Sequence, residues 1–201
     1  MTGEPQDIAD ADPHVVRKSA DETGGEFVRF ESTMYPASAE GPSDTDLAHE
    51  PWGLDNDFEH VHTEQEERLA VVSGELRVVL PGEERTLTEG ETVEIPRNTP
   101  HRHFNPTDRP TRLTWERRPA LRTEEWAETV YAIAQAGETD EDGVPGPLQA
   151  AVILDEYAAE NPYFASVPVG LQRVLASAVA PIGRLAGVEA SRSRERPGPD
   201  R

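Results

Sequence analysis

The sequence predicts an all-β sandwich or barrel that is followed by an α-helical extension. From Glu26 to Arg118, short segments alternate apolar and polar residues and are separated by turns rich in Gly, Pro or Asn. Many short strands at even spacing are typical of an antiparallel sandwich or barrel. After Pro119 the apolar residues recur at helical spacing instead. The chain of 201 residues is long enough to bury a core, and it contains no cysteine, so the fold depends on no disulfide.

The predicted strands share an alternation of apolar and polar residues. They lie in the segments EFVRFE, ERLAVVS, ELRVVLP, ERTLTE, ETVEIP, HRHFN and TRLTWERR. The turns between them contain the pairs Ser73-Gly74, Pro81-Gly82, Glu89-Gly90, Arg97-Asn98 and Asn105-Pro106. Residues of these types favour tight turns, which join neighbouring strands in antiparallel order.

Three helices are predicted after the strands, over residues 123–136, 147–160 and 169–187. The first begins with Thr123 as a candidate cap and ends before Gly137, as expected of helix ends. The third carries an apolar stripe along one face, formed by Leu171, Val174, Leu175, Ala178, Ile182 and Leu185. We expect this stripe to pack on the barrel or on a partner subunit, and the alternative is a membrane surface.

The two ends of the chain contain few residues that could pack into a core. Residues 1–25 are rich in Asp, Glu, Ala and Gly, which predicts a disordered acidic arm. Residues 189–201 are polar and locally basic, which predicts a disordered tail. The chain therefore divides into this arm, a barrel over 26–119, a helical extension over 120–188 and the tail.

The charge of the chain excludes one class of partner. Asp and Glu number 39 against 19 Lys and Arg, so the formal net charge is −20. A phosphate backbone repels such a surface, and we expect no binding to nucleic acid. Lys18 is the single lysine, a composition typical of proteins from concentrated salt, although an arginine-rich genome with acidic segments gives a similar one. The N-terminus lacks the basic and apolar regions of a signal peptide, so a cytoplasmic protein with no membrane association is expected.

Histidines cluster in the strand-rich segment and indicate a metal site. His60 and His62 are two residues apart in an extended stretch, so both imidazoles face the same side, about 7 Å apart. Glu67 has the wrong parity to join them on one straight strand, so the chain must bend between Thr63 and Glu66. With His101 on a later strand, three imidazoles and one carboxylate suit Mn, Fe, Co, Ni, Cu or Zn rather than Ca or Mg.

The spacing of these residues resembles the two signatures of the cupin superfamily. The first signature reads His60-Val-His62, four residues, Glu67, six residues and Gly74, and the second reads Gly90, five residues, Pro96, then His101, three residues and Asn105. The family usually has glycine where Asn98 stands, and Asn is the residue type other than Gly that best tolerates a left-handed turn.

The resemblance implies a double-stranded β-helix, or jelly-roll barrel, over about residues 27 to 119. It also implies one divalent transition metal (Fe, Mn, Ni, Cu or Zn) with His60, His62, Glu67 and His101 as its ligands. Barrels of this family often pair through their sheets, which implies a homodimer.

His103 and Glu67 are the candidate catalytic residues. Strand alternation puts His103 on the same side as His101, where its imidazole suits a hydrogen-bond donor near the metal or a proton relay. The alternative is a solvent-facing histidine at the barrel rim. Glu67 lies in an acidic run with Glu64 and Glu66, and the spacing favours Glu67 as the ligand.

Several neighbouring residues have structural interpretations. Asn105 is expected to form hydrogen bonds at a strand end, and Trp115 and Phe104 are expected in the core. Arg102 and Arg112 could contact an anionic substrate, although surface ion pairs are favoured in so acidic a chain.

Two functions of different classes fit the sequence. The first is a metalloenzyme with dioxygenase-, isomerase- or decarboxylase-like chemistry on a small oxygenated molecule, as the resemblance implies. The second is a non-catalytic module that binds or senses a small ligand over the metal. An intact set of four candidate ligands argues against a purely structural or storage role.

Overall fold

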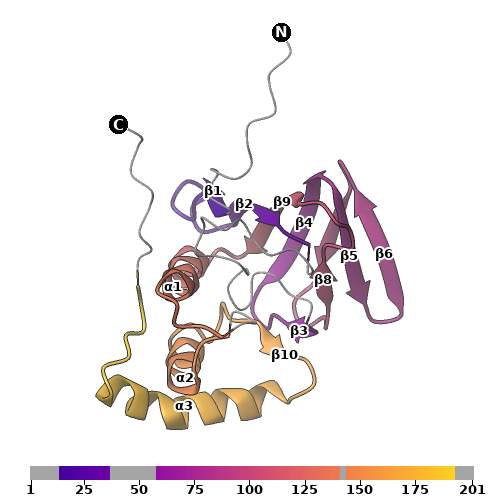
Figure 1. Ribbon diagram of the computed structural model, residues 1–201. Helices are drawn as coiled ribbons and strands as arrows, with labels where there is room; N and C mark the ends of the chain where they lie inside the picture. The colour runs from indigo at the N-terminus through magenta and orange to yellow at the C-terminus, as the bar shows by residue number, and fades with distance from the viewer. Residues whose placement is uncertain (1–13, 37–57, 141–143, 193–201) are drawn as a thin grey trace, which may run out of the picture.

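A computed structural model describes residues 14–36, 58–140 and 144–192, and it shows a β-barrel with three helices packed at one side and end (Figure 1). The strands and their bounds are β1 (His14–Lys18), β2 (Val28–Met34), β3 (His60–Val61), β4 (Glu66–Ser73), β5 (Glu75–Leu80), β6 (Glu83–Thr88), β7 (Thr92–Ile95), β8 (Arg102–Phe104), β9 (Thr111–Arg118) and β10 (Tyr163–Phe164). The helices are α1 (Thr123–Gln135), α2 (Pro147–Glu156) and α3 (Val169–Leu185).

The strands form two main antiparallel sheets that enclose the core. One sheet has the order β1-β2-β9-β4-β7, the second has the order β6-β5-β8, and β10 pairs with β3 in a short third sheet. Burial alternates along β4, where Leu69 and Val71 are buried between more exposed neighbours. Residues from both main sheets, such as Leu76 and Trp115, meet in one core cluster. The predicted all-β barrel with a C-terminal helical extension is therefore confirmed.

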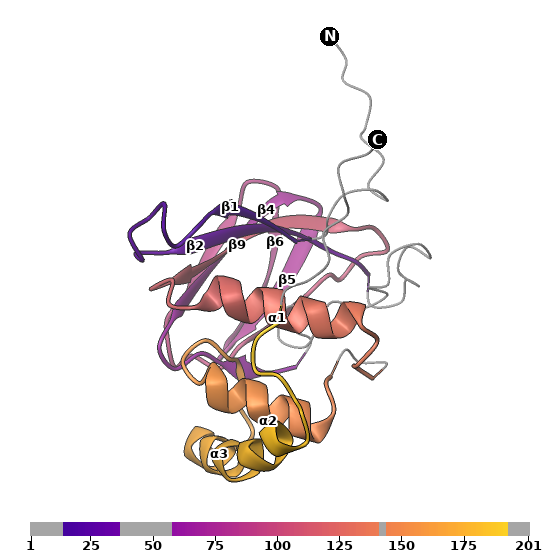
Figure 2. The same cartoon turned by 90° about the vertical axis from the view of Figure 1, so that its left-hand side faces the viewer.

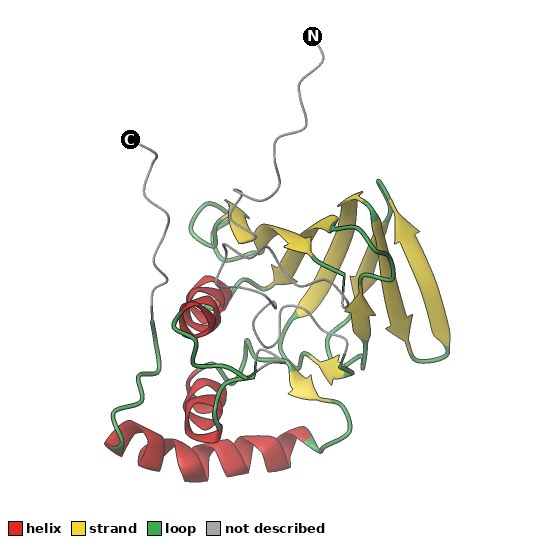
Figure 3. Cartoon of the chain, in the orientation of Figure 1, coloured by secondary structure: helices red, strands yellow, loops and turns green. Residues whose placement is uncertain are grey.

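The helices cover one side of the barrel and form a stack below it (Figures 1 and 2). Trp126 of α1 is fully buried in the core cluster, and its indole N–H donates to Asn161 Oδ1 at 2.8 Å. The side-chain amide of Asn161 donates in turn to the carbonyls of Ile153 and Tyr157 at the end of α2. Helix α2 was predicted to reach residue 160 but ends at Glu156, because this hydrogen bonding closes the helix in a turn. Figure 3 shows how the helices segregate from the strands.

The predicted disorder of the N-terminal arm is wrong for residues 14–25. The first strand, β1, pairs with β2, and Val16 and Ala20 pack against the core. The Ala20 N–H also donates to the Glu124 carboxylate of α1, and this contact joins the segment to the helix. The acidic composition of the arm predicted disorder, but it gave no sign of a short strand that is stabilised by pairing with the edge of a sheet. Residues 1–13 lie outside the described residues.

The predicted disorder of the C-terminal tail is likewise wrong for residues 189–192. The Arg192 N–H donates to Thr129 Oγ1 at 3.2 Å, and the Arg192 guanidinium pairs with Glu138 at 2.8 Å. The backbone carbonyl of Glu189 accepts a hydrogen bond from the Gln149 side chain. Residues 189–192 therefore pack against α2 and α1. Residues 193–201 lie outside the described residues.

The apolar stripe of α3 does not pack on the barrel. The helix contacts α2 instead, through a face of small residues that includes the buried Ala176, Ala180 and Gly183. A Cβ atom on Gly183 would lie 2.7 Å from Val152 Cγ2, so the helices approach closely at this point. The larger side chains of the stripe lie on the opposite face and are exposed. Within the described residues, no helix is long and apolar enough to cross a membrane.

Candidate metal centre

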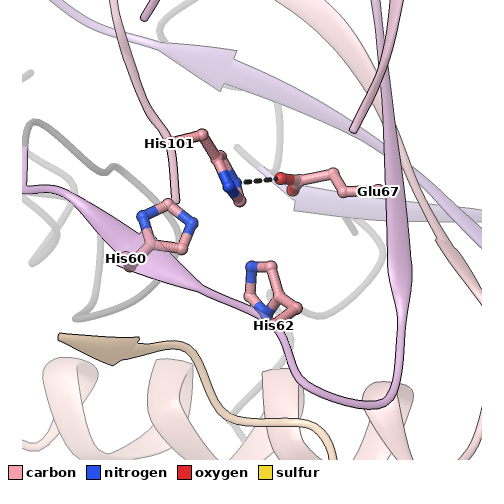
Figure 4. A group of neighbouring side chains, drawn as sticks. All are labelled: His60, His62, Glu67 and His101. Carbon is pink, nitrogen blue, oxygen red and sulfur yellow. Dashed lines mark hydrogen bonds and ion pairs between the residues drawn. The ribbon is translucent and has the colours of Figure 1, made fainter. Parts of the chain in front are cut away.

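The predicted ligands come together inside the barrel, from three separate places in the chain (Figure 4). His60 lies on β3, and an isolated bridge joins it to His101 just before β8. The His60 N–H donates to the His101 carbonyl at 2.8 Å, and the reciprocal hydrogen bond measures 2.9 Å. This backbone pairing places the two imidazoles side by side, with ring centroids 4.1 Å apart.

The predicted bend before Glu67 is present. Strand β3 ends at Val61 and β4 begins at Glu66, so the intervening residues change the parity. Gln65 is buried and fixes the bend, because its side-chain amide donates to the Pro119 carbonyl at 2.6 Å and to Thr123 Oγ1 at 2.8 Å. The start of the helical extension therefore supports the loop that orients the carboxylate of Glu67.

Asn98 holds the same loop from another side. Its φ angle is 63°, in the left-handed region, as the sequence predicted for this replacement of glycine. The Asn98 N–H donates to the His62 carbonyl at 2.7 Å. The turn thereby fixes the backbone of His62 next to the cluster.

The extension also pairs with the strand that carries His60. In β10, Phe164 is the register partner of His60, and the Ala165 N–H donates to the Glu59 carbonyl at 3.0 Å. Phe58 packs between the two, with ring centroids 5.2 Å from His60 and 5.0 Å from Phe164. The helical extension is therefore part of the scaffold of the site.

Four side chains form what we call the His/Glu cluster, namely His60, His62, Glu67 and His101. One potential ligand atom from each lies within 4.8 Å of the others, and all four residues are buried. The Nδ1 atoms of His60 and His101 face the carbonyls of Phe58 and Thr99, at 3.1 and 2.9 Å. Such hydrogen bonds orient imidazoles and leave Nε2 to face a metal.

Several polar atoms of the cluster lack a protein partner. Within the described residues, His60 Nε2 and both ring nitrogens of His62 accept or donate no hydrogen bond. His101 Nε2 lies 2.8 Å from Glu67 Oε2. Buried polar atoms are nearly always hydrogen-bonded or bound to an ion. A metal ion among these nitrogens would satisfy them, and the residues present fit that role.

The environment sets the charge of each candidate ligand. Burial, with the neighbouring His101, lowers the pKa of His60 well below its ordinary value, and burial does the same for His62. Burial alone would raise the pKa of Glu67, but Arg117 and His101 outweigh it and hold that pKa well below the usual range. At neutral pH, His60 and His62 are therefore neutral and Glu67 is a carboxylate, as metal coordination requires.

Arg117 is a residue of the site that the sequence analysis missed. On β9 it is the register partner of Glu67, and its Nη2 lies 3.0 Å from Glu67 Oε1. Its guanidinium lies over the ring of Trp115, 4.8 Å from the centroid, and the side chain is 1% exposed. The alternation of Leu113, Trp115 and Arg117 along one strand face is the signal that points inward.

His103 lies on the inner side of β8, so the predicted orientation is confirmed and the solvent-facing alternative is wrong. Its ring is nearly parallel to that of His101, with centroids 6.3 Å apart. Burial lowers its pKa to about 4. Neither of its ring nitrogens has a hydrogen-bond partner in the described part of the chain.

The remaining predicted residues lie outside the cluster. Asn105 is structural, because its amide donates to the Met34 and Arg109 carbonyls and its Oδ1 accepts from Thr107. Trp115 is buried in the core, and Phe104 is half-buried beneath the Arg102 guanidinium.

The charged residues at the surface form ion pairs, as favoured by the sequence. Arg112 pairs with Glu31, so it forms the surface ion pair that was favoured over a substrate contact. Glu64 lies 3.7 Å from Arg173 and Glu66 is exposed. Of the three glutamates in the acidic run, the buried one is therefore Glu67.

Comparisons with known proteins give the family. Residues 52–115 match the family model described as Cupin domain, and this segment contains the whole His/Glu cluster. No curated protein matches the chain. Among solved structures, a sugar phosphate isomerase from Silicibacter pomeroyi is 20% identical, and the match covers 53% of this chain and 59% of that chain with a TM-score of 0.38.

Two further structures show similar values. KdgF from a Halomonas species is 17% identical over 57% of this chain and 85% of that chain, with a TM-score of 0.39. The polyketide cyclase RemF from Streptomyces resistomycificus is 22% identical over 52% of this chain and 63% of that chain, with a TM-score of 0.38. The matched signatures and the barrel that carries them identify residues 52–115 as a cupin domain.

Proposed function

We propose that this cupin binds one divalent first-row transition metal through the His/Glu cluster and acts with it on a small oxygenated molecule. The observation that carries the proposal is the convergence of four buried ligand atoms within 4.8 Å, with three histidine nitrogens of the cluster left unpartnered in the described residues. In the described part of the chain, no protein group forms a hydrogen bond with these nitrogens.

The donor set supports a class of metal. Three imidazoles and one carboxylate suit Fe, Mn, Ni, Cu or Zn, whereas Ca and Mg prefer oxygen ligands. Four protein ligands leave a coordination position open on a five- or six-coordinate ion. When bound, such an ion polarises an oxygen atom of a ligand and stabilises negative charge there.

The chain's own residues would orient the substrate and move its protons. Arg117 and His101 hold the pKa of Glu67 well below its usual range, so Glu67 is a carboxylate that suits a metal ligand better than a proton acceptor. His103 is a neutral imidazole beside His101, so one ring nitrogen is available to donate a hydrogen bond to a substrate and the other to accept one. These roles fit dioxygenase-, isomerase- or decarboxylase-like chemistry.

The burial of the site favours one alternative, a non-catalytic module that holds a small ligand over the metal. His60 and His62 are 0% and 2% exposed, and Glu67 and His101 are each 1% exposed. A closed site retains a ligand well, whereas an enzyme must open to exchange substrate and product.

Elemental analysis tests the metal proposal. The protein is purified without chelator or affinity nickel, alongside a variant that combines His60→Ala with His101→Ala. We expect about one equivalent of a first-row metal in the wild type and none in the double variant. His103→Gln is the matched control, because it changes a buried histidine outside the His/Glu cluster and should retain the metal. Metal retained in the double variant would place the ligands elsewhere.

Activity assays separate the two functions once metal is found. Metal-dependent oxygen consumption or conversion of diketone, phenolic or sugar-derived substrates would support an enzyme. Ligand binding without turnover would support the binding module.

A further inference from the structure

The His/Glu cluster does not account for all the unpartnered polar atoms inside the barrel. Arg117 Nε and Nη1 and both ring nitrogens of His103 also lack hydrogen-bond partners within the described residues. Each of the two residues is 1% exposed. A metal held by the cluster would leave these donors unsatisfied.

Unpaired donors at such depth are costly. A buried polar group without a partner costs about 1–3 kcal/mol, and more when it is charged. Other arginines of β9 show the usual solution: Arg112 pairs with Glu31, and Arg118 pairs with Glu26 and Glu116. Arg117 has one ion pair, with Glu67, and keeps two donors free of protein partners.

Arg117 and His103 flank the cluster. Arg117 contacts Glu67 at 3.0 Å, and the ring of His103 lies parallel to that of His101. The ring of Trp115 supports the guanidinium from one side at 4.8 Å, which fixes the orientation of its donors. Both side chains therefore lie beside residues of the His/Glu cluster.

The donors define the chemistry of that ligand. A guanidinium only donates, and its planar fork matches an anion with two oxygens in one plane. A neutral imidazole adds one donor and one acceptor. We propose that Arg117 and His103 form a binding site for a carboxylate, or for the enolate of a similar planar group, next to the metal. This inference rests on the proposed metal function and names its substrate class.

Calorimetric titration with formate and acetate tests the site. Both anions are titrated into metal-loaded protein and into chelator-treated protein. The variants are Arg117→Lys, which keeps the cation beside Glu67 but removes the fork, and His103→Gln, which removes the imidazole. Arg112→Lys is the matched control, since Arg112 lies on the same strand and is exposed. We expect each site variant to weaken binding about tenfold or more, as loss of a charge-assisted hydrogen bond does, and the control to leave it unchanged.

The outcomes separate the inference from the proposed function. Equal affinity in the wild type and both site variants, or no binding of either anion, overturns the oxyanion site even if metal binds. Binding that depends on Arg117 in protein that takes up no metal supports the oxyanion site and contradicts the metal proposal. Thermal unfolding of each variant shows that the fold is retained, and His103→Gln decides the question if Arg117→Lys does not fold.

A second inference concerns the exposed face of α3. Five large aliphatic residues of α3 are exposed, by 49% at Leu171, 66% at Val174, 54% at Leu175, 59% at Ile182 and 90% at Leu185. At 100° per residue these side chains form one continuous stripe, along a helix of about 25 Å. The stripe faces away from α2, which α3 contacts through small residues.

Two occupants of this stripe are disfavoured by the contacts around it. An anionic membrane repels a chain of net charge −20, and both arginines of α3 are already paired, Arg173 with Thr63 and Arg184 with Asp155. Within the described residues, the chain after α3 does not return over the stripe, because residues 188–192 run toward Thr129 of α1.

The charge distribution favours a second copy of this chain. Residues 161–188 contain no Asp or Glu, although the whole chain has 39. Two strongly acidic copies meet with least repulsion across this face, and an apolar stripe along a helix can pair with its own copy under two-fold symmetry. We infer that the protein forms a homodimer through antiparallel contact of the two α3 stripes.

Light scattering after size-exclusion chromatography in high salt tests this dimer. Val174→Arg puts a charge in the centre of the stripe and should give a monomer. Val72→Arg is the matched control on β4, where Val72 is 38% exposed, and should leave a dimer. A monomeric wild type, a dimer that survives Val174→Arg, or a dimer lost in Val72→Arg overturns the inference. Binding of the wild type to phosphatidylcholine vesicles that Val174→Arg abolishes, with no dimer, would assign the stripe to a membrane instead.

Discussion

Replacement of Arg117 by Met removes the charge that faces Glu67 inside the barrel. Met has a similar length and is apolar, so the change deletes the ion pair at 3.0 Å while largely filling the space. Both partners are 1% exposed, so water cannot replace the lost interaction. Within the described residues, the hydrogen-bonded neighbour that then remains to the buried Glu67 carboxylate is His101.

The burial of the pair sets the size of the effect. Breaking a buried ion pair by removing one partner typically costs about 3–5 kcal/mol, because an uncompensated charge remains. The comparison is Arg112→Met on the same strand, where the arginine is 45% exposed and its partner Glu31 also pairs with Arg17. A surface pair of this kind contributes about 0–1 kcal/mol. We therefore expect Arg117→Met to destabilise the protein by at least about 2 kcal/mol more than Arg112→Met does.

Urea unfolding of chelator-treated protein at neutral pH measures these free energies. A double-mutant cycle with Glu67→Gln isolates the pair, since the doubly substituted protein lacks both charges. We expect the double variant to be more stable than Arg117→Met alone, because no unpaired carboxylate remains. If Arg117→Met and Arg112→Met had equal effects, the carboxylate of Glu67 would not depend on Arg117, and the account of its charge would be wrong.

Three further predictions concern stability. In chelator-treated protein, the free energy of unfolding should fall by about 2 kcal/mol between about pH 7 and pH 5 because of His103. The pKa of this imidazole is about 4 in the folded protein, whereas the unfolded chain takes up the proton below about pH 6.5. This contribution to stability is present at high pH and is lost as the pH falls through that window. The urea midpoint should therefore change less with pH in His103→Gln than in the wild type, and an equal change in the two proteins would contradict the prediction. Gly183→Ala should destabilise the protein by about 1 kcal/mol net, because a Cβ at 2.7 Å from Val152 Cγ2 costs about 2 kcal/mol and the better helix propensity of Ala offsets about 1 kcal/mol. The control Gly170→Ala has open space around it and should stabilise the protein. A higher melting temperature in both variants would refute the packing of α3 on α2. Asn98→Ala should cost about 1 kcal/mol at a φ of 63° while Asn98→Gly should be nearly neutral, and an equal loss in both would show that the Asn side chain matters more than the turn.

Much of the site could be predicted because its geometry follows from strand periodicity and turn chemistry. The two-residue spacing of His60 and His62, and the parity of Glu67, predict a bend that the structure contains. The left-handed Asn98 follows from the turn that a barrel of this kind needs. These are local constraints, and one sequence is enough to state them.

Arg117 was missed because an arginine on a strand is normally assigned to the solvent side. The alternation with Leu113 and Trp115 pointed inward, but only the register with Glu67 shows which acid pairs with it. A pairing between strands that are 50 residues apart in the sequence is set by the sheet and not by local pattern.

The orientation of α3 could not be predicted from the sequence for a similar reason. Periodicity identifies an apolar stripe but not the surface it meets. The close approach at Gly183 and the ion pairs of Arg184 with Asp155 and Glu156 decide which face contacts α2. The short strand β1 was missed because its stability comes from pairing with β2 rather than from its own composition.

Anomalous diffraction from crystals of the protein, collected at the absorption edge of the metal that copurifies with it, tests the central claim most directly. We predict one strong peak among His60, His62, Glu67 and His101. A peak at another place in the molecule, or a metal-free cluster in crystals grown with excess metal, would contradict it.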